Sequence, residues 1–160
     1  MGSKNTIVIF CDGASKGNPG HSGIGAVAYL LKDFSNKDFL DFMNTFHYEK
    51  KLFELSQYIG VNSNNFAEYT SLKLALEKVL EIFQKNQLLK DLALLIFMDS
   101  ELVVNQLNGI YKVKNSNLKN IYNEVQEILK KFPNWKIQHI PREQNQVADR
   151  LANLSLKKIF

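Results

Sequence analysis

The sequence has few of the features that mark secreted, membrane-spanning or disulfide-stabilised proteins. Its 160 residues include one cysteine, Cys11, which excludes an internal disulfide and a zinc site built on several thiolates. Lysine or aspartate interrupts every apolar run well before the roughly 20 residues needed to cross a bilayer. No apolar secretory segment follows the first methionine. We therefore expect a cytoplasmic protein with no membrane partner, and Cys11 buried as a small apolar residue.

The composition is that of a globular protein. Apolar residues make up 45% of the chain and charged residues 22%, values typical of a chain that folds around a core. There is no internal repeat or linker, so we expect residues 1–160 to form a single domain and, by default, a monomer. The formal net charge of +4 slightly favours a polyanionic partner but leaves most functions open.

The first part of the chain has the pattern of strands. Residues 7–11 form a continuous apolar run rich in β-branched side chains, which is typical of a strand buried on both faces. Residues 13–23 contain several glycines and predict a loop. We expect 25–31 to return as an antiparallel strand and 52–59 to form a third. The charged and aromatic segment 32–51 predicts no particular structure.

The second part alternates helices and strands. After Asn64 and Asn65, apolar residues recur at positions 69, 72, 76, 79 and 83, the spacing of a helix. The following elements are expected to be a strand at 92–98, a short helix at 100–108, a helix at 118–132, a strand at 135–140, and a helix at 146–157 that is N-capped by Asn145. The sum predicts an α/β fold in which helices pack on a mixed sheet.

Four carboxylates stand at the ends of these expected elements. Asp12 and Asp99 end apolar strands, Glu68 lies in the first turn of a helix, and Asp149 lies near the start of the last helix. Acids gathered at one edge of a sheet raise one another's pKa unless a hard cation neutralises them. Oxygen ligands of this kind suit magnesium or manganese.

Each acid also has a simpler explanation when it is considered alone. Asp12 before a glycine fits a turn, and Asp99 before a serine fits a helix cap. Glu68 and Asp149 fit first-turn acids that complement the helix dipole. The catalytic interpretation therefore depends on all four acids occurring together.

The segments around the four acids resemble, in chain order, those of type 1 ribonuclease H. They are Asp-Gly-Ala-Ser-Lys-Gly-Asn-Pro-Gly at 12–20, Asn-Asn-Phe-Ala-Glu at 64–68, Met-Asp-Ser at 98–100 and Asn-Gln-Val-Ala-Asp at 145–149. The resemblance extends over nearly the whole chain and is greatest to compact bacterial and archaeal members, which lack a basic helical protrusion. It implies an α/β fold with a five-stranded mixed sheet, the first three strands antiparallel, and helices on both faces.

The resemblance also implies an activity and its cofactor. Members of this family are endonucleases that hydrolyse the RNA strand of RNA–DNA hybrids and leave 5′-phosphate and 3′-hydroxyl ends. Two Mg²⁺ ions, with Mn²⁺ as a substitute, would be held by Asp12, Glu68, Asp99 and Asp149. In that family one ion helps to generate the attacking hydroxide and the other stabilises the leaving 3′ oxygen.

Five further residues are candidates for substrate binding, and four of them match positions of the family. Asn18, Asn64 and Asn65 stand at positions that contact the nucleic acid, and an amide both donates to and accepts from a ribose 2′-hydroxyl. Ser63 stands where the family often has a threonine near a DNA-strand phosphate, and Lys16 is suited to a phosphate contact. A turn and a helix cap are the alternative explanations for the asparagines.

Two residues compete for one auxiliary catalytic role. The family often carries a histidine before its last acid, which is thought to assist product release or proton transfer, and compact members can use arginine. His139 and Arg142 both stand near this place, so either fits. His21 and His47 have no motif around them and are expected on the surface.

Two other functions remain compatible with the sequence. A different nuclease or polynucleotidyl transferase of the same fold would share the acids. A nucleic-acid-binding module without catalysis would usually have lost one of them.

Overall fold

The structure is a computed structural model that describes residues 5–31, 50–83 and 89–157. The segment 32–49, for which the sequence predicted no structure, lies outside these residues. The described elements are β1 (Asn5–Gly17), β2 (Gly20–Leu31), β3 (Lys50–Asn62), α2 (Asn64–Phe83), η1 (Leu89–Asp91), β4 (Leu92–Met98), α3 (Glu101–Leu107), α4 (Ser116–Leu129), β5 (Asn134–His139), η2 (Arg142–Gln144) and α5 (Gln146–Lys157).

The strands form one five-stranded sheet in the order β3-β2-β1-β4-β5. The first three strands are antiparallel, whereas β4 runs parallel to β1 and β5 runs parallel to β4. The β1 strand lies in the centre because its apolar run is buried on both faces, with Ile7, Val8 and Ile9 fully inaccessible to solvent. The mixed five-stranded sheet expected from the sequence is confirmed.

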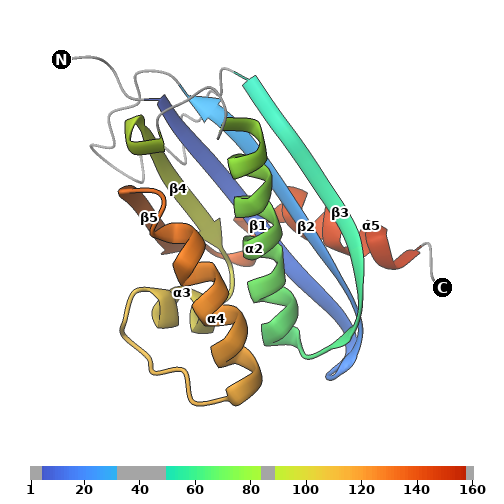
Figure 1. The fold of residues 1–160 in the computed structure, drawn as a ribbon. Coiled ribbons are helices and arrows are strands. Elements are labelled where there is room, and N and C mark those ends of the chain that lie inside the picture. Colours follow the sequence, from blue (N-terminus) through green and yellow to red (C-terminus); the bar gives the residue numbers. More distant parts are fainter. Residues whose placement is uncertain (1–4, 32–49, 84–88, 158–160) are drawn as a thin grey trace.

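Helices cover both faces of this sheet. In Figure 1, α2, α3 and α4 lie in front of the sheet and α5 lies behind it. The apolar stripe of α2 is buried as predicted, and α4 buries a similar stripe: Leu118, Ile121, Val125 and Leu129. None of the helices in the described part of the chain is long and apolar enough to span a membrane.

The glycine-rich segment 13–23 is not a loop as expected, because both strands continue through it. The β1–β2 ladder extends to the pair Gly17–Gly20, and only Asn18 and Pro19 make the turn. The prediction failed because glycine is also used where main chains approach closely. A Cβ on Gly13 would lie 2.4 Å from the carbonyl carbon of Ala67 in α2.

Most other bounds differ from the prediction by only a few residues. The β3 strand is longer than the expected 52–59, and α4 begins before 118. The early start of α4 follows from Asn115, whose side chain accepts hydrogen bonds from the backbone N–H groups of Asn117 and Leu118. An asparagine in this position satisfies donors that the helix itself leaves unpaired.

The close approach of α5 to the sheet provides a stability test. A Cβ on Gly25 would lie 2.1 Å from the carbonyl oxygen of Ala148, so Gly25→Ala has to push α5 away from β2. We expect this change to lower the free energy of unfolding by about 1–3 kcal/mol, the usual cost of overpacking. Urea denaturation of the wild type and the variant measures it.

Gly60→Ala is the comparison variant. Gly60 has φ +86°, and no atom lies within 4 Å of the position that a Cβ would take there. Alanine at this position therefore costs only about 1–2 kcal/mol of backbone strain. If Gly25→Ala leaves the free energy of unfolding unchanged while Gly60→Ala lowers it, close packing is not the reason for the glycine in β2.

Candidate active site

Asp12 and Asp99 meet because they continue two adjacent parallel strands. Phe10 of β1 pairs with Phe97 of β4, and each acid follows two residues later, so both emerge at the same edge of the sheet. The helix-cap explanation of Asp99 does not hold, because Ser100 caps α3 by accepting a hydrogen bond from the N–H of Val103. The Asp99 carboxylate is therefore not used for capping.

Glu68 reaches the same edge from α2, but not from its first turn as predicted. The helix begins at Asn64, and Ser63 caps it by accepting a hydrogen bond from the N–H of Phe66. Glu68 is therefore one turn further along, beyond the donors that the helix start leaves unpaired. Its carboxylate instead accepts a hydrogen bond from the N–H of Gly13.

Asp149 comes from the other face of the sheet. It lies in the first turn of α5, as expected. Its Oδ1 atom is 3.7 Å from Nη2 of Arg142 and 3.2 Å from Nδ2 of Asn153. Asn153 lies one helical turn after Asp149 in α5. It was not among the residues expected from the sequence, where its spacing of four residues from Asp149 is the one signal that points to it.

The four acids surround one cavity. Carboxylate oxygens of Asp12, Glu68 and Asp99 lie within 4.8 Å of one another, and Asp149 is close enough to raise the pKa of Asp12. The cavity has a volume of about 430 Å³ and is lined by Asp12, Gly13, Ala14, Ser15, Asn64, Glu68, Asp99, Arg142, Asp149 and Asn153. The structure thus brings acids from β1, α2, the end of β4 and α5 to a single point.

Burial makes this concentration of negative charge costly. Burial and then repulsion by Glu68 raise the pKa of Asp12, which is 5% exposed. Burial raises the pKa of Glu68 to about 7, although hydrogen bonds from Asp12 and Gly13 act in the opposite direction. Burial likewise raises the pKa of Asp99. At neutral pH the site therefore needs shared protons or a bound cation.

The donor set fits a hard divalent cation. All four acids offer oxygen atoms, which are the ligands that magnesium and manganese prefer. Among the described residues that line the cavity, Arg142 is the one with a fixed positive charge, and its side chain is 78% exposed. A single exposed guanidinium does not balance four carboxylates.

The residues expected to bind substrate lie around the start of α2. Asn64 lines the acidic cavity, and its backbone N–H donates to Oδ1 of Asn18 at 3.0 Å. This bond joins the turn of the β1–β2 hairpin to the helix. Ser63 precedes the helix, Asn65 is its second residue, and Lys16 lies exposed near the end of β1.

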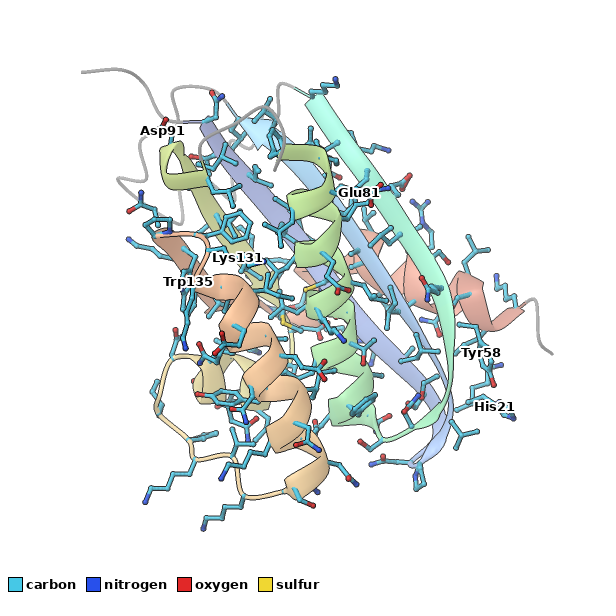
Figure 2. All side chains as sticks on the ribbon, in the orientation of Figure 1. His21, Tyr58, Glu81, Asp91, Lys131 and Trp135 are labelled. Atoms are coloured by element: carbon cyan, nitrogen blue, oxygen red, sulfur yellow. The ribbon has the colours of Figure 1, made fainter. Side chains whose placement is uncertain are left out.

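The structure separates the two candidates for the auxiliary role. Arg142 lines the cavity, whereas His139 is an exposed residue at the end of β5, paired in register with Met98. His21 is partly buried, and its Nδ1 atom is 2.7 Å from the hydroxyl oxygen of Tyr58. Figure 2 shows these two side chains together at one end of the β2–β3 pair. His47 lies outside the described residues.

Asn145 does not have the capping role that the sequence predicted. Its side chain is 1% exposed, and Nδ2 donates to the carbonyl oxygen of Cys11 at 3.0 Å. The side chain also lies beside the carboxylate of Asp99 and lowers its pKa against the effect of burial. The prediction failed because the buried acceptors on β1 and β4 come from distant parts of the sequence.

Comparisons with known proteins agree with this geometry. A family model described as "Reverse transcriptase-like" matches residues 51–155. The crystal structure of LC11-RNase H1 in complex with an RNA/DNA hybrid is 37% identical, with a TM-score of 0.78 over 96% of this chain and 98% of that chain. This chain belongs to the type 1 ribonuclease H family. The resemblance identified in the sequence and the predicted fold class are both confirmed.

Two other relatives extend the comparison. RNase H1 from the archaeon Halobacterium salinarum is 30% identical, with a TM-score of 0.75 over 96% of this chain and 98% of that chain. A bifunctional protein of Mycobacterium tuberculosis is 35% identical over 147 residues, which cover 92% of this chain and 34% of that protein. The chain therefore spans about a third of the length of this mycobacterial relative.

The raised pKa values predict how stability depends on pH in the absence of metal. Glu68 binds its proton more tightly in the folded protein, with a pKa of about 7 against 4.5 for the ordinary side chain. Folding is therefore opposed increasingly as pH rises from about 4.5 to 7, by up to about 3 kcal/mol. Urea denaturation in EDTA at pH 4.5 to 8 measures this loss.

The matched variant for this test is Glu68→Gln, which has no proton to lose at this position. Its free energy of unfolding should fall less than that of the wild type over the same pH range. Saturating magnesium should restore wild-type stability more at pH 8 than at pH 5, since metal binding competes with protons. Parallel pH profiles for wild type and Glu68→Gln would contradict the assignment of this raised pKa.

Proposed function

We propose that this chain is a metal-dependent endonuclease that hydrolyses the RNA strand of RNA–DNA hybrids and leaves 5′-phosphate and 3′-hydroxyl ends. The observation that carries the proposal is the convergence of Asp12, Glu68 and Asp99 within 4.8 Å, with Asp149 in the same cavity. The relative that binds an RNA/DNA hybrid is similar over nearly its whole length, which supports the choice of substrate.

The four acids would hold two Mg²⁺ ions, with Mn²⁺ as a substitute. Such ions lower the pKa of a water molecule and stabilise the leaving oxygen. The task of the protein is to keep the carboxylates in place and deprotonated. The N–H of Gly13 fixes Glu68, and Asn153 and Arg142 contact Asp149, so two of the four acids are held before substrate arrives.

The start of α2 would bind the substrate strands. Asn64 lines the cavity, where its amide is suited to a ribose 2′-hydroxyl, and Asn18 fixes its backbone. Asn65 follows on the same turn. Ser63 stands at the helix N-terminus, which favours anions and suits a DNA-strand phosphate. Lys16 on the hairpin would contact a phosphate further along.

The loop between α3 and α4 would also contact the hybrid backbone, through its basic side chains. Ile110 and Tyr111 are 67% and 45% exposed, and the exposed side chains of Lys112 and Lys114 follow them in the loop. Lysines of this kind give affinity that falls as salt concentration rises.

We assign the auxiliary role to Arg142 in preference to His139. Arg142 stands at the rim of the cavity, 3.7 Å from Asp149, where a positive charge is able to contact the scissile phosphate or the product. His139 would then serve no catalytic function. We further propose that the chain acts as a monomeric single domain in the cytoplasm.

Cleavage assays with a set of labelled substrates test the proposed activity. RNA–DNA hybrid should be cut only when magnesium or manganese is present, while single-stranded RNA and duplex DNA should stay intact. Cleavage of duplex DNA would indicate another nuclease of this fold. Binding of the hybrid without cleavage in magnesium or manganese would indicate a binding module.

Asp99→Asn should abolish cleavage and leave the fold intact. Removing one ligand of the metal site costs several kcal/mol of transition-state stabilisation, or roughly a thousandfold in rate. Because the four charges repel one another, the metal-free variant should melt no lower than the wild type. The control is Asp91→Asn, an exposed acid at the opposite end of β4 (Figure 2), which should cleave normally. A large fall in the melting temperature of Asp99→Asn would make Asp99 structural instead.

Arg142→Ala and His139→Ala test the auxiliary role. We expect Arg142→Ala to lower kcat roughly tenfold, since a positive charge near the reacting phosphate is lost. His139→Ala should keep the wild-type rate, and both variants should melt normally because both side chains are exposed. The opposite result, a slow His139→Ala and a normal Arg142→Ala, would transfer the role to the histidine.

A further inference from the structure

One buried asparagine, through its side chain and its backbone, lies against three of the segments that carry the acids. Asn145 lies between η2 and α5 and is 1% exposed. Its Nδ2 atom donates to the carbonyl oxygen of Cys11, the residue before Asp12, at 3.0 Å. Its side chain also lies beside the Asp99 carboxylate, where it lowers the pKa of that group against the effect of burial. Its own carbonyl oxygen accepts from the N–H of Asp149 at 3.1 Å.

The segments that Asn145 contacts belong to elements that are far apart in the sequence. Asp12 is on β1 and Asp99 follows β4, whereas Asp149 belongs to α5, which packs on the opposite side of the sheet from α2. Asn145 is therefore a direct link from the start of α5 to both strand ends. Its position fixes where Asp149 lies relative to the other two acids.

The chemistry of the contacts requires the amide nitrogen. The carbonyl oxygen of Cys11 accepts a hydrogen bond from Nδ2, and the nearby Asp99 carboxylate is also an acceptor, so an amide N–H suits this place and an apolar side chain does not. The Oδ1 atom is buried and accepts no hydrogen bond from any described residue. An unpaired buried oxygen is costly, so fold stability alone does not favour asparagine here.

We propose that Asn145 is a positioning residue that sets the spacing of Asp12, Asp99 and Asp149 and thereby the affinity of the site for divalent metal. This inference rests on the proposed function, because it takes the acids to be metal ligands. Partners that orient metal ligands typically contribute about 10- to 100-fold in affinity. A merely structural Asn145 would affect stability and leave metal affinity unchanged.

The test is isothermal titration calorimetry of the full chain with MgCl₂ or MnCl₂ in the absence of nucleic acid. Asn145→Leu keeps a side chain of similar length but removes both donors, and Asn145→Ala removes the contacts altogether. We expect the metal Kd to rise at least about tenfold in both variants. With RNA–DNA hybrid, the magnesium concentration for half-maximal rate should rise by a similar factor, while KM for the hybrid stays unchanged.

Gln106→Leu is the matched control. Gln106 is a buried amide, 4% exposed, that donates to the carbonyl oxygen of Lys112 at 3.4 Å and accepts from the Tyr69 hydroxyl at 2.6 Å. Neither partner is an acid. This variant should lose thermal stability but keep the metal Kd of the wild type within twofold.

Each outcome has one interpretation. Wild-type metal affinity in the two Asn145 variants overturns the positioning role, as does failure of both variants to fold at 25 °C, which would make Asn145 structural. An equal loss of affinity in Gln106→Leu also overturns it. If the wild type itself binds neither metal, the proposed function fails instead.

Discussion

Repulsion among buried carboxylates is the constraint on which the rest of this structure depends. Oxygens of Asp12, Glu68 and Asp99 lie within 4.8 Å of one another, and burial raises the pKa of each of these groups. Without a bound cation, the cluster therefore lowers the stability of the fold. The remaining packing must therefore supply the energy that holds four like charges together, and the apolar core around β1 and α2 does so.

Glycines and side-chain amides, more than cationic side chains, allow the four acids to come together. Gly13 allows α2 to approach β1 so closely that a backbone N–H reaches Glu68. Asn153 donates to Asp149, and the amide of Asn145 lies beside Asp99. Neutral donors hold carboxylates in place without neutralising them, which leaves the charge available to a metal ion. Arg142 stays at the exposed rim, where its charge is suited to a phosphate group.

The sequence predicted most of the fold because the periodicity of apolar residues reports burial directly. The stripe of α2, with Tyr69, Leu72, Leu76 and Val79, is buried as its spacing indicated. The prediction failed at 13–23, where glycines were taken for a loop, and at Glu68, which was placed in the first turn. Both errors have one cause: the structural role of a glycine, or of a residue near a helix start, depends on the element packed against it, which the local sequence does not reveal.

The sequence by itself determined the family, the identity of the four acids and the strand and helix ends that carry them, because these depend on local patterns within short segments. Only the tertiary structure decided that Arg142 lines the acidic cavity while His139 does not, that Ser63 caps α2, and that Asn145 donates to the carbonyl oxygen of Cys11. These contacts join residues that lie far apart along the chain or point in directions that the pattern of side chains does not specify. Their geometry exists only after the helices have packed on both faces of the sheet.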